Sequence, residues 1–325
     1  MQKVGIIMEE KKCHITSIGG QAVIEGVMMR GPKDIAVAVR KPDGEIEIDK
    51  KPLSSILQKC KWLKLPIIRG VVSFIESLII GTKALMYSAS FFDLEEEETK
   101  KKKESMTEEE RAALEKKESK ALTFTIYTSV VFALVFGIGI FMLLPTFLVG
   151  LVKPYIPYDF LATLFEGIVR IIIFLVYIIL VSQMKDIRRV FEYHGAEHKT
   201  IFCYESGDEL TPENARKYSR LHPRCGTSFL LIVMVVSIIL FSFISWDNAV
   251  MRIILRLALL PVVAGLSYEV IKFAGRSKSR CMKIVSAPGM LLQKLTTREP
   301  DDSQLEVAIA SLKSVLTGNR EDDKW

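Results

Sequence analysis

The chain has 325 residues, 49% of them hydrophobic, and a formal net charge of +6. Its apolar residues are gathered in long blocks, which is typical of a membrane protein and argues against an ordinary soluble domain. The basic residues lie between these blocks without interleaved aromatic residues. The charge therefore favours the lipid bilayer as a partner over nucleic acid, and leaves the identity of a specific protein or lipid partner open.

Residues 1–60 are predicted to form a small β-rich element. The stretch "IAVAVRKPDGEIEIDKK" alternates apolar and polar residues on either side of "KPDG", which predicts a β-hairpin. The preceding "SIGGQAVIEGVMMRGP" has four glycines and a proline, and predicts a tightly turned loop.

Residues 61–92 form an ambiguous apolar segment with basic flanks. Arg69, Glu76 and Lys83 recur every seven residues, so on a helix they share one face. We expect a helical segment that lies in the membrane interface, with a re-entrant segment as the alternative. Residues 93–120 are highly charged and predict a solvated helix or a flexible linker.

Residues 121–274 are predicted to hold four membrane-spanning helices, at 121–152, 161–184, 227–246 and 249–274. The connection at 183–228 is rich in lysine and arginine, whereas the other two connections are not. The positive-inside rule then places this connection and both termini in the cytoplasm of a multi-pass cell-membrane protein. The five cysteines are odd in number and irregularly spaced, so they indicate no disulfide framework.

Residues 275–325 are expected to form a cytoplasmic tail with one amphipathic helix. The helix starts after Pro300, and Leu305, Ile309, Leu312 and Leu316 line one of its faces. The predicted fold class is thus a mainly α membrane protein with about four spans, an interfacial or re-entrant helical segment and a small N-terminal β-hairpin element.

The 183–228 connection carries the residues that point to chemistry. His194 and His198 are four apart, so on a helix both imidazoles lie on one side, as a shared metal requires. "HGAEH" fits the H-x-x-E-H pattern, in which Glu197 would be the general base. His222 and Cys225 in "LHPRCGTSF" supply further ligands, and imidazole with thiolate favours Zn²⁺. Reserve carboxylates are Glu205 and Asp208.

Three interpretations of this cluster stay open at the level of sequence. Four ligands would close a structural zinc site, three would leave a position open for catalysis, and a pair of interfacial histidines would hold no metal at all. A straight continuation of the second span would carry His194 about 18 Å beyond Ser182 at 1.5 Å per residue. The two halves of the cluster therefore meet only if that helix bends or the 203–221 segment folds back.

Charged residues inside the predicted spans form a second set: Glu166, Arg170 and Arg256. Charges in lipid must pair or face water, so Glu166 is expected to pair with Arg170 or with Arg256. The alternative is a polar cavity or a conduction route.

Four blocks, "GGQAVIEGVMMRGP", "YHGAEHKTI", "LHPRCGTSF" and "LTTREPDD" with "QLEVAI", resemble the signatures of the YqhQ-like family. These are bacterial membrane proteins defined by a domain of unknown function (DUF1385) and labelled as predicted metal-dependent enzymes. The resemblance covers nearly the whole chain. It implies that His194, Glu197, His198, His222 and Cys225 are site positions. The glycine block, whose ionisable residues are Glu25 and Arg30, is expected to pack nearby.

The leading functional hypothesis is a zinc-dependent hydrolase at the cytoplasmic membrane face. In it His194, His198 and either His222 or Cys225 hold Zn²⁺, and Glu197 activates a water. The first alternative is a non-catalytic membrane scaffold or assembly factor with a structural metal site. The second is a transporter that uses the charges inside the membrane.

Overall fold

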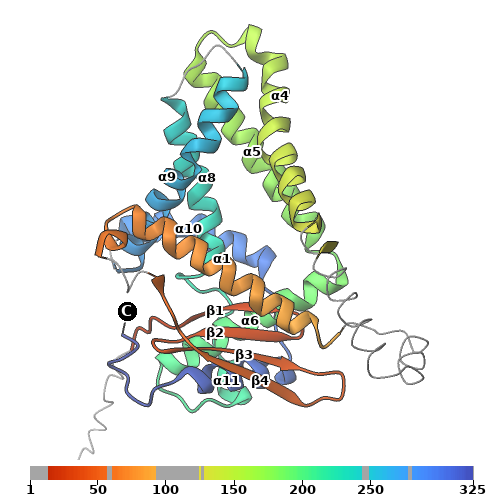
Figure 1. Cartoon of the computed structure of the whole chain (residues 1–325), viewed down its shortest axis with the longest axis vertical. Coiled ribbons are helices and arrows are strands. Elements are labelled where there is room, and N and C mark those ends of the chain that lie inside the picture. Colours follow the sequence, from red (N-terminus) through yellow and green to blue (C-terminus); the bar gives the residue numbers. More distant parts are fainter. Residues whose placement is uncertain are drawn as a thin grey trace, which may run out of the picture. The chain divides into compact units, whose positions relative to one another are not determined.

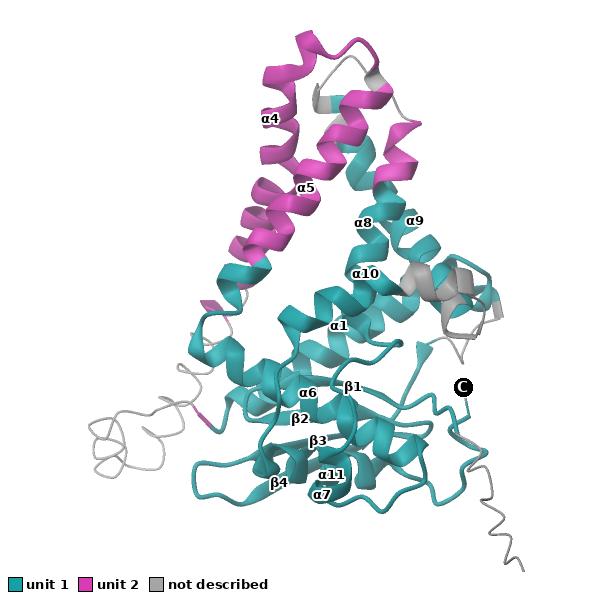
Figure 2. Cartoon of the chain, turned by 180° about the vertical axis from the view of Figure 1, so that it is seen from behind, with its two compact units in different colours: residues 1–91, 178–237, 248–325 teal, residues 92–177, 238–247 magenta. Residues whose placement is uncertain are grey.

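A computed structural model describes residues 14–56, 61–92, 124–125, 128–243, 249–276 and 280–324. The predicted charged linker at 93–120 lies outside these ranges, as do Cys13 and Cys60. The chain divides into two compact units (Figure 2). Unit 1 comprises Met1–Phe91, Ile178–Ser237 and Asn248–Trp325, and unit 2 comprises Phe92–Tyr177 and Ile238–Asp247.

Unit 1 is built on a four-stranded antiparallel sheet with the strand order β1-β2-β3-β4 (Figure 1). The strands are β1 (Gly19–Val23), β2 (Gly26–Arg30), β3 (Asp34–Arg40) and β4 (Ile46–Pro52). The predicted hairpin around "KPDG" is confirmed as β3 and β4, and Gly44 supplies the positive φ of its turn. The predicted loop at the glycine block is wrong, because this segment forms a second hairpin, β1 and β2.

The following helices belong wholly or in part to unit 1: η2 (Lys61–Lys64), α1 (Ile68–Ala89), α5 (Asp159–Val181), α6 (Lys185–Glu205), α7 (Pro212–Arg216), α8 (Gly226–Ser242), α9 (Ala249–Arg276), α10 (Arg280–Thr296) and α11 (Asp302–Val315). Only one helix, α11, was predicted for the C-terminal tail, so α10 is an addition. Asp301 caps α11 through a capping box with Gln304, which confirms the predicted start of that helix.

The sheet is covered on both faces. Val27, Met29, Ala36 and Ala38 point to one side and form a continuous buried core with α6 and α11. The alternate positions point to α1, since the side chain of Gln21 lies against Gly81. β1 is therefore an edge strand with α6 on one side and α1 on the other.

The α1 helix has a protein-facing side and an exposed apolar side. On the protein side Glu76 is buried and accepts hydrogen bonds from Ser55 Oγ and the Ile56 N–H. Arg69 forms an ion pair with Glu269 of α9, and Gly70 and Gly265 let the two helices approach closely. The exposed apolar residues of its other side are Phe74, Ile75, Leu78, Ile79, Leu85 and Met86.

The break before α6 explains how the second predicted span can end before the cluster begins. The helix α5 (Asp159–Val181) stops, and Met184 is extended, with φ −67° and ψ 132°. The cluster histidines therefore belong to a new helix rather than to a straight continuation of the span. The two halves of the cluster can meet because α6 does not continue the second span.

Unit 2 contains the π-helix η3 (Gly139–Leu143), the helices α4 (Leu144–Val152) and η4 (Lys153–Tyr155), and most of α5. Inside it Arg170 Nη2 lies 2.9 Å from Glu166 Oε1, which also accepts the hydroxyl of Thr146 at 2.8 Å. Arg170 Nε donates to the carbonyl oxygen of Phe141 in η3. The pair expected between Glu166 and Arg170 is thus present; Arg256 is buried on α9.

Among the residues that the structure describes, four helices are long and apolar enough to cross a membrane: Ile68–Ala89, Thr128–Tyr155, Phe160–Val181 and Ile254–Phe273. This confirms the fold class, a mainly α membrane protein with four candidate spans and a small N-terminal sheet. The membership of the four differs from the prediction. The segment at 61–92 contains one continuous 22-residue helix. The predicted third span corresponds to α8, which has only 17 residues within the described part of the chain.

Candidate metal centre

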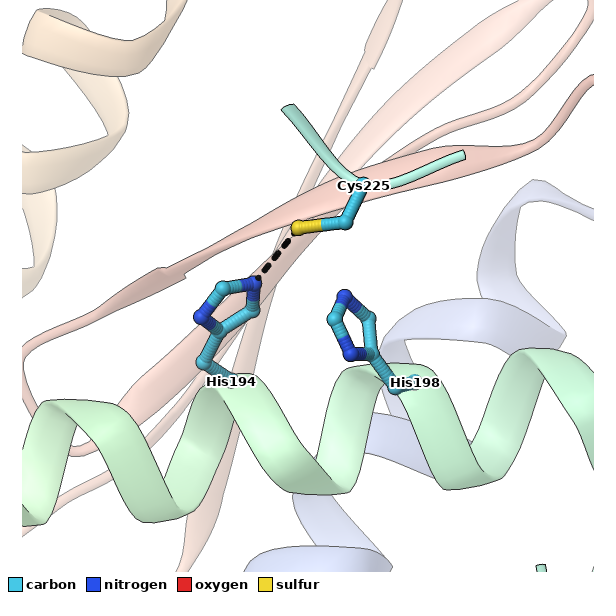
Figure 3. Close-up of side chains that lie close together, drawn as sticks. All are labelled: His194, His198 and Cys225. Atoms are coloured by element: carbon cyan, nitrogen blue, oxygen red, sulfur yellow. Dashed lines mark hydrogen bonds between the residues drawn. The ribbon is translucent and has the colours of Figure 1, made fainter. Parts of the chain in front are cut away.

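His194, His198 and Cys225 converge in unit 1 (Figure 3), and we call them the trio. One ligand atom from each lies within 4.8 Å of the other two. His194 Nε2 and Cys225 Sγ are 3.2 Å apart, and the two imidazole ring centroids are 4.5 Å apart. Tetrahedral zinc, with bonds of about 2.0–2.3 Å, places neighbouring ligand atoms about 3.5 Å apart. The donor types, and the 3.2 Å between His194 Nε2 and Cys225 Sγ, therefore fit such an ion.

The two histidine rings are held in the orientation that metal binding needs. Nδ1 of His194 lies 2.8 Å from the carbonyl oxygen of Thr296, and Nδ1 of His198 lies 2.6 Å from that of Arg220. A carbonyl can only accept, so each Nδ1 carries a proton, and in a neutral ring Nε2 then presents a lone pair. Within the described residues, Nε2 of His198 is buried without a hydrogen-bond partner. A metal ion would satisfy it.

Cys225 enters the cluster from the turn that precedes α8. Its N–H donates to the carbonyl of His222, and its Sγ accepts the N–H of Thr227 at 3.4 Å. These bonds fix the thiol opposite α6. The placement of His194 and His198 on one helix face, predicted from the four-residue interval, is confirmed by α6.

Glu197 lies beside the trio but outside it. Its Oε1 accepts the N–H of Gly20 at 3.0 Å, while its Oε2 is buried with no hydrogen-bond partner among the described residues. Burial raises the pKa of the Glu197 carboxyl, and His194 and the Gly20 N–H oppose this shift only in part. A carboxyl of this kind can accept a proton more readily than an exposed one.

His222 does not supply a ligand atom to the trio, although it lies close to it. Its ring centroid is 5.5 Å from that of His198. Its Nε2 lies 3.2 Å from Nη2 of Arg224 and 3.9 Å from a carboxylate oxygen of Glu205. Burial lowers the pKa of His222 to about 4, against the effect of Glu205, so the ring is neutral near pH 7.

The reserve carboxylates are engaged elsewhere. Glu205 accepts the N–H of Thr16 and the guanidinium of Arg224. Burial acts to raise its pKa, yet His222 and Arg224 hold the pKa of Glu205 below its usual range. Asp208 accepts the hydroxyl of Tyr218 at 2.6 Å.

The glycine block reaches the site through β1. Arg30 and the backbone of Gly19 and Gly20 border the same cavity as the trio. Glu25 lies instead at the β1–β2 turn, where it pairs with Arg189 and accepts the hydroxyl of Tyr193. The Glu25 backbone has a positive φ of 48°, which these side-chain contacts stabilise.

Helix α10, which was not predicted, packs against residues of the site. Its Gln293 is fully buried, accepts the N–H of His222 at 2.7 Å and donates to the carbonyl of His222 at 2.8 Å. Gly289 allows α10 to pack directly on Ser228 of α8, because a Cβ at this position would overlap that serine. The block "LTTREPDD" resembles a family signature, but its residue types do not indicate contacts with the histidines of the site.

A cavity of about 780 Å³ opens at the trio. It lies along the edge strand β1, between α6 and α1. The trio, Glu197, His222 and Arg224 border it from one side, and Ser73, Ser77 and Ile80 of α1 and Tyr268 of α9 from the other. A volume of this size accommodates an organic molecule as well as water.

Comparison with known proteins gives the chain its family. Residues 65–318 match the family model described as "Protein of unknown function (DUF1385)". The chain belongs to this family. It is 37% identical over 303 residues to the uncharacterized protein YqhQ of Bacillus subtilis (strain 168), and the match covers 92% of each chain. No solved structure matches. The resemblance found in the sequence blocks is confirmed, and the DUF1385 match includes all three residues of the trio.

Proposed function

We propose that this DUF1385 protein is a membrane-bound, zinc-dependent hydrolase whose site faces the cytoplasm. One observation carries the proposal: three converging ligands, His194, His198 and Cys225, border a cavity that also holds the buried Oε2 of Glu197, which has no hydrogen-bond partner among the described residues. Catalytic zinc sites use three protein ligands and leave one position open, whereas structural sites close all four.

The residues of the chain have separable roles in this proposal. The carbonyls of Thr296 and Arg220 orient the imidazoles, and Cys225 supplies the negative charge. When bound, Zn²⁺ supplies Lewis-acid chemistry, which polarises a carbonyl or phosphoryl oxygen and lowers the pKa of water. Glu197, held at one oxygen by Gly20, takes up a proton at its free Oε2.

The cytoplasmic placement rests on the distribution of charge. The 183–228 connection and both flanks of the membrane helices are rich in lysine and arginine, as the positive-inside rule requires of a cytoplasmic face. The reduced cytoplasm also suits an unoxidised thiol at Cys225.

The experiment compares three forms of the full-length protein purified in detergent: wild type, Glu197→Gln and Cys225→Ala. Zinc content is measured by mass spectrometry, and lipid and metabolite extracts of the expressing cells are searched for products that have gained one water. A hydrolase predicts zinc in wild type and Glu197→Gln, loss of zinc in Cys225→Ala, and products with the wild type alone. Equal products with wild type and Glu197→Gln, or no zinc in either, would overturn the proposal.

A further inference from the structure

The cavity beside the trio is bordered by α6 on one side and by α1 and α9 on the other. The α6 wall carries His194, Glu197 and His198, and also the apolar residues Val190, Phe191 and Ile201. The opposite wall comes from α1 and α9, two of the helices that are long and apolar enough to cross a membrane. The site is therefore enclosed in part by helices whose composition suits lipid.

The residues that both border the cavity and are exposed mark where it reaches the surface. They are Ser17, Gly19, Ser77 and Gly226. Ser77 belongs to α1, and Gly226 is the first residue of the apolar helix α8. These two helices touch through Phe74 and Phe229, whose ring centroids are 5.8 Å apart. The mouth of the cavity is thus bordered by two apolar helices and by the edge strand β1.

The outer side of α1, next to Ser77, is apolar and exposed. Leu78 is 54% exposed and Ile75 and Ile79 are each 48% exposed. On the other side of the helix, Glu76 accepts a hydrogen bond from Ser55 and Ser88 accepts one from the N–H of Ile24 in the β1–β2 turn. A helix with one polar, protein-bound side and one exposed apolar side suits contact with lipid. The mouth therefore opens beside a surface of α1 that suits lipid.

The cavity has both apolar and polar lining. Its apolar side chains include Ile18, Met28, Leu53 and Ile80. At the trio are two buried atoms without hydrogen-bond partners in the described chain, Glu197 Oε2 and His198 Nε2. A ligand that satisfies both kinds of lining has a polar head and an apolar body.

We propose that the site takes a membrane amphiphile, with its polar head at Glu197 and the trio and its apolar chain leaving between Ser77 and Gly226. The proposal names the substrate class of the hydrolase proposed above and rests on that function for the reaction. In that reaction one water adds across a bond of the head: the hydroxyl goes to the carbonyl or phosphoryl centre, and the proton goes to the departing oxygen or nitrogen.

The test uses the full-length protein in vesicles of phosphatidylglycerol that contain a small fraction of an analogue with a photoreactive diazirine in its acyl chain. After irradiation, labelled peptides are mapped by mass spectrometry. We expect labels on Met28 of β2 and on Leu53, which follows β4, because both residues border the cavity. Ser77→Trp should reduce these labels by about tenfold or more.

Two further variants keep the result interpretable. Leu78→Trp places the same side chain on the adjacent outward position and should leave the cavity labels unchanged. Gly19→Leu narrows the opposite rim, where an added Cβ meets no atom within 4 Å, and should reduce the labels as Ser77→Trp does. Labels confined to outward positions of α1, or equal cavity labels in all four proteins, would overturn the amphiphile proposal.

Zinc content is measured on the same samples, so failure of this proposal and failure of the proposed function are distinguishable. Zinc without cavity labels overturns the amphiphile as substrate and leaves the zinc site standing. Cavity labels without zinc support the amphiphile site and overturn the hydrolase. Retained zinc in Ser77→Trp also shows that the variant has folded around the trio.

Discussion

His194 on α6 and Thr296 at the end of α10 are 102 residues apart in sequence, yet His194 Nδ1 lies 2.8 Å from the carbonyl oxygen of Thr296. A second hydrogen bond joins the same two segments two residues later, where the N–H of Arg298 donates to the carbonyl of Phe191. The C-terminal segment therefore positions a candidate zinc ligand. Its packing on α6 requires a glycine at position 195.

Replacing Gly195 by alanine should destabilise the protein and weaken zinc binding. Alanine normally stabilises a helix by about 1 kcal/mol relative to glycine. Here the added Cβ would overlap the backbone carbonyl oxygen of Arg298, and overpacking of this kind costs about 1–3 kcal/mol. Thermal unfolding in detergent measures the change. Gly150→Ala, where a Cβ meets no atom within 4 Å, is the matched control. A higher unfolding temperature for Gly195→Ala would contradict the packing argument.

The ligand set is tested by two histidine variants. His198→Ala removes one of the three ligands of the trio, and should lose nearly all bound zinc. His222→Ala removes a ring that faces Arg224 and Glu205, and should retain zinc close to the wild-type stoichiometry. Zinc per protein, measured by mass spectrometry, distinguishes them. Equal losses in the two variants would favour a closed site of four ligands.

Removal of the metal should lower stability in a concentration-dependent manner. An ion that binds only the folded state stabilises it by about 2.7 kcal/mol when its free concentration is one hundred times the dissociation constant. The unfolding temperature of the wild type should therefore fall on chelation and recover with added zinc. Cys225→Ala should show neither response. A wild-type protein that is indifferent to the chelator would contradict zinc binding by the trio.

The helical part of the site could be predicted from the sequence because its spacing is local. His194, Glu197 and His198 fall on one turn of α6, and the four-residue interval alone places both imidazoles on one side. The proximity of Cys225 depended instead on the break at Met184, where an extended residue separates α5 from α6. No composition signal at that position distinguishes a break from a bend.

Two parts of the fold could not be predicted, for different physical reasons. The β1–β2 turn places Glu25 in a left-handed conformation that usually belongs to glycine or asparagine. Its usual turn signal is therefore missing, and Arg189 and Tyr193 supply the stabilisation from a distant helix. Helix α10 contains Pro288, a residue type that usually indicates a break in a helix. Its role at the site comes from long-range contacts such as that of Gln293 with His222.

The cap of α11 predicts a specific dependence of stability on pH. Burial acts to raise the pKa of Asp301, but the hydroxyl of Ser303 and the N–H of Gln304 hold it below its usual range. A carboxylate with a lowered pKa stabilises the folded state above its unfolded pKa of about 3.9, and this contribution is lost as the pH falls through the folded value. Asp301→Asn keeps an acceptor for the cap without this titration.

The free energy of unfolding of the wild type should exceed that of Asp301→Asn near neutral pH, and the gap should narrow below about pH 4. Asp301→Ala removes the cap and should cost about 1 kcal/mol at neutral pH. Asp302→Asn removes a neighbouring carboxylate that pairs with Arg216 at the surface, and serves as the control for charge. A gap that widens on acidification would contradict the assignment.

The buried pair in unit 2 predicts a characteristic pattern in a double-mutant cycle. Glu166 Oε1 accepts bonds from Arg170 and from Thr146, and both charged side chains are buried. Removing one member of a buried pair costs about 3–5 kcal/mol, whereas replacing both by apolar residues is often close to neutral. Arg170→Met should therefore destabilise more than the double variant Glu166→Leu with Arg170→Met.

Unfolding in detergent measures the stability of each variant in the cycle, and Thr146→Val reports the contribution of the hydroxyl alone. If the double variant is as unstable as the sum of the single variants, the pair does not act as a unit. If the double variant is stable and retains the full biological activity of the protein, conduction through these two charges is excluded as the function.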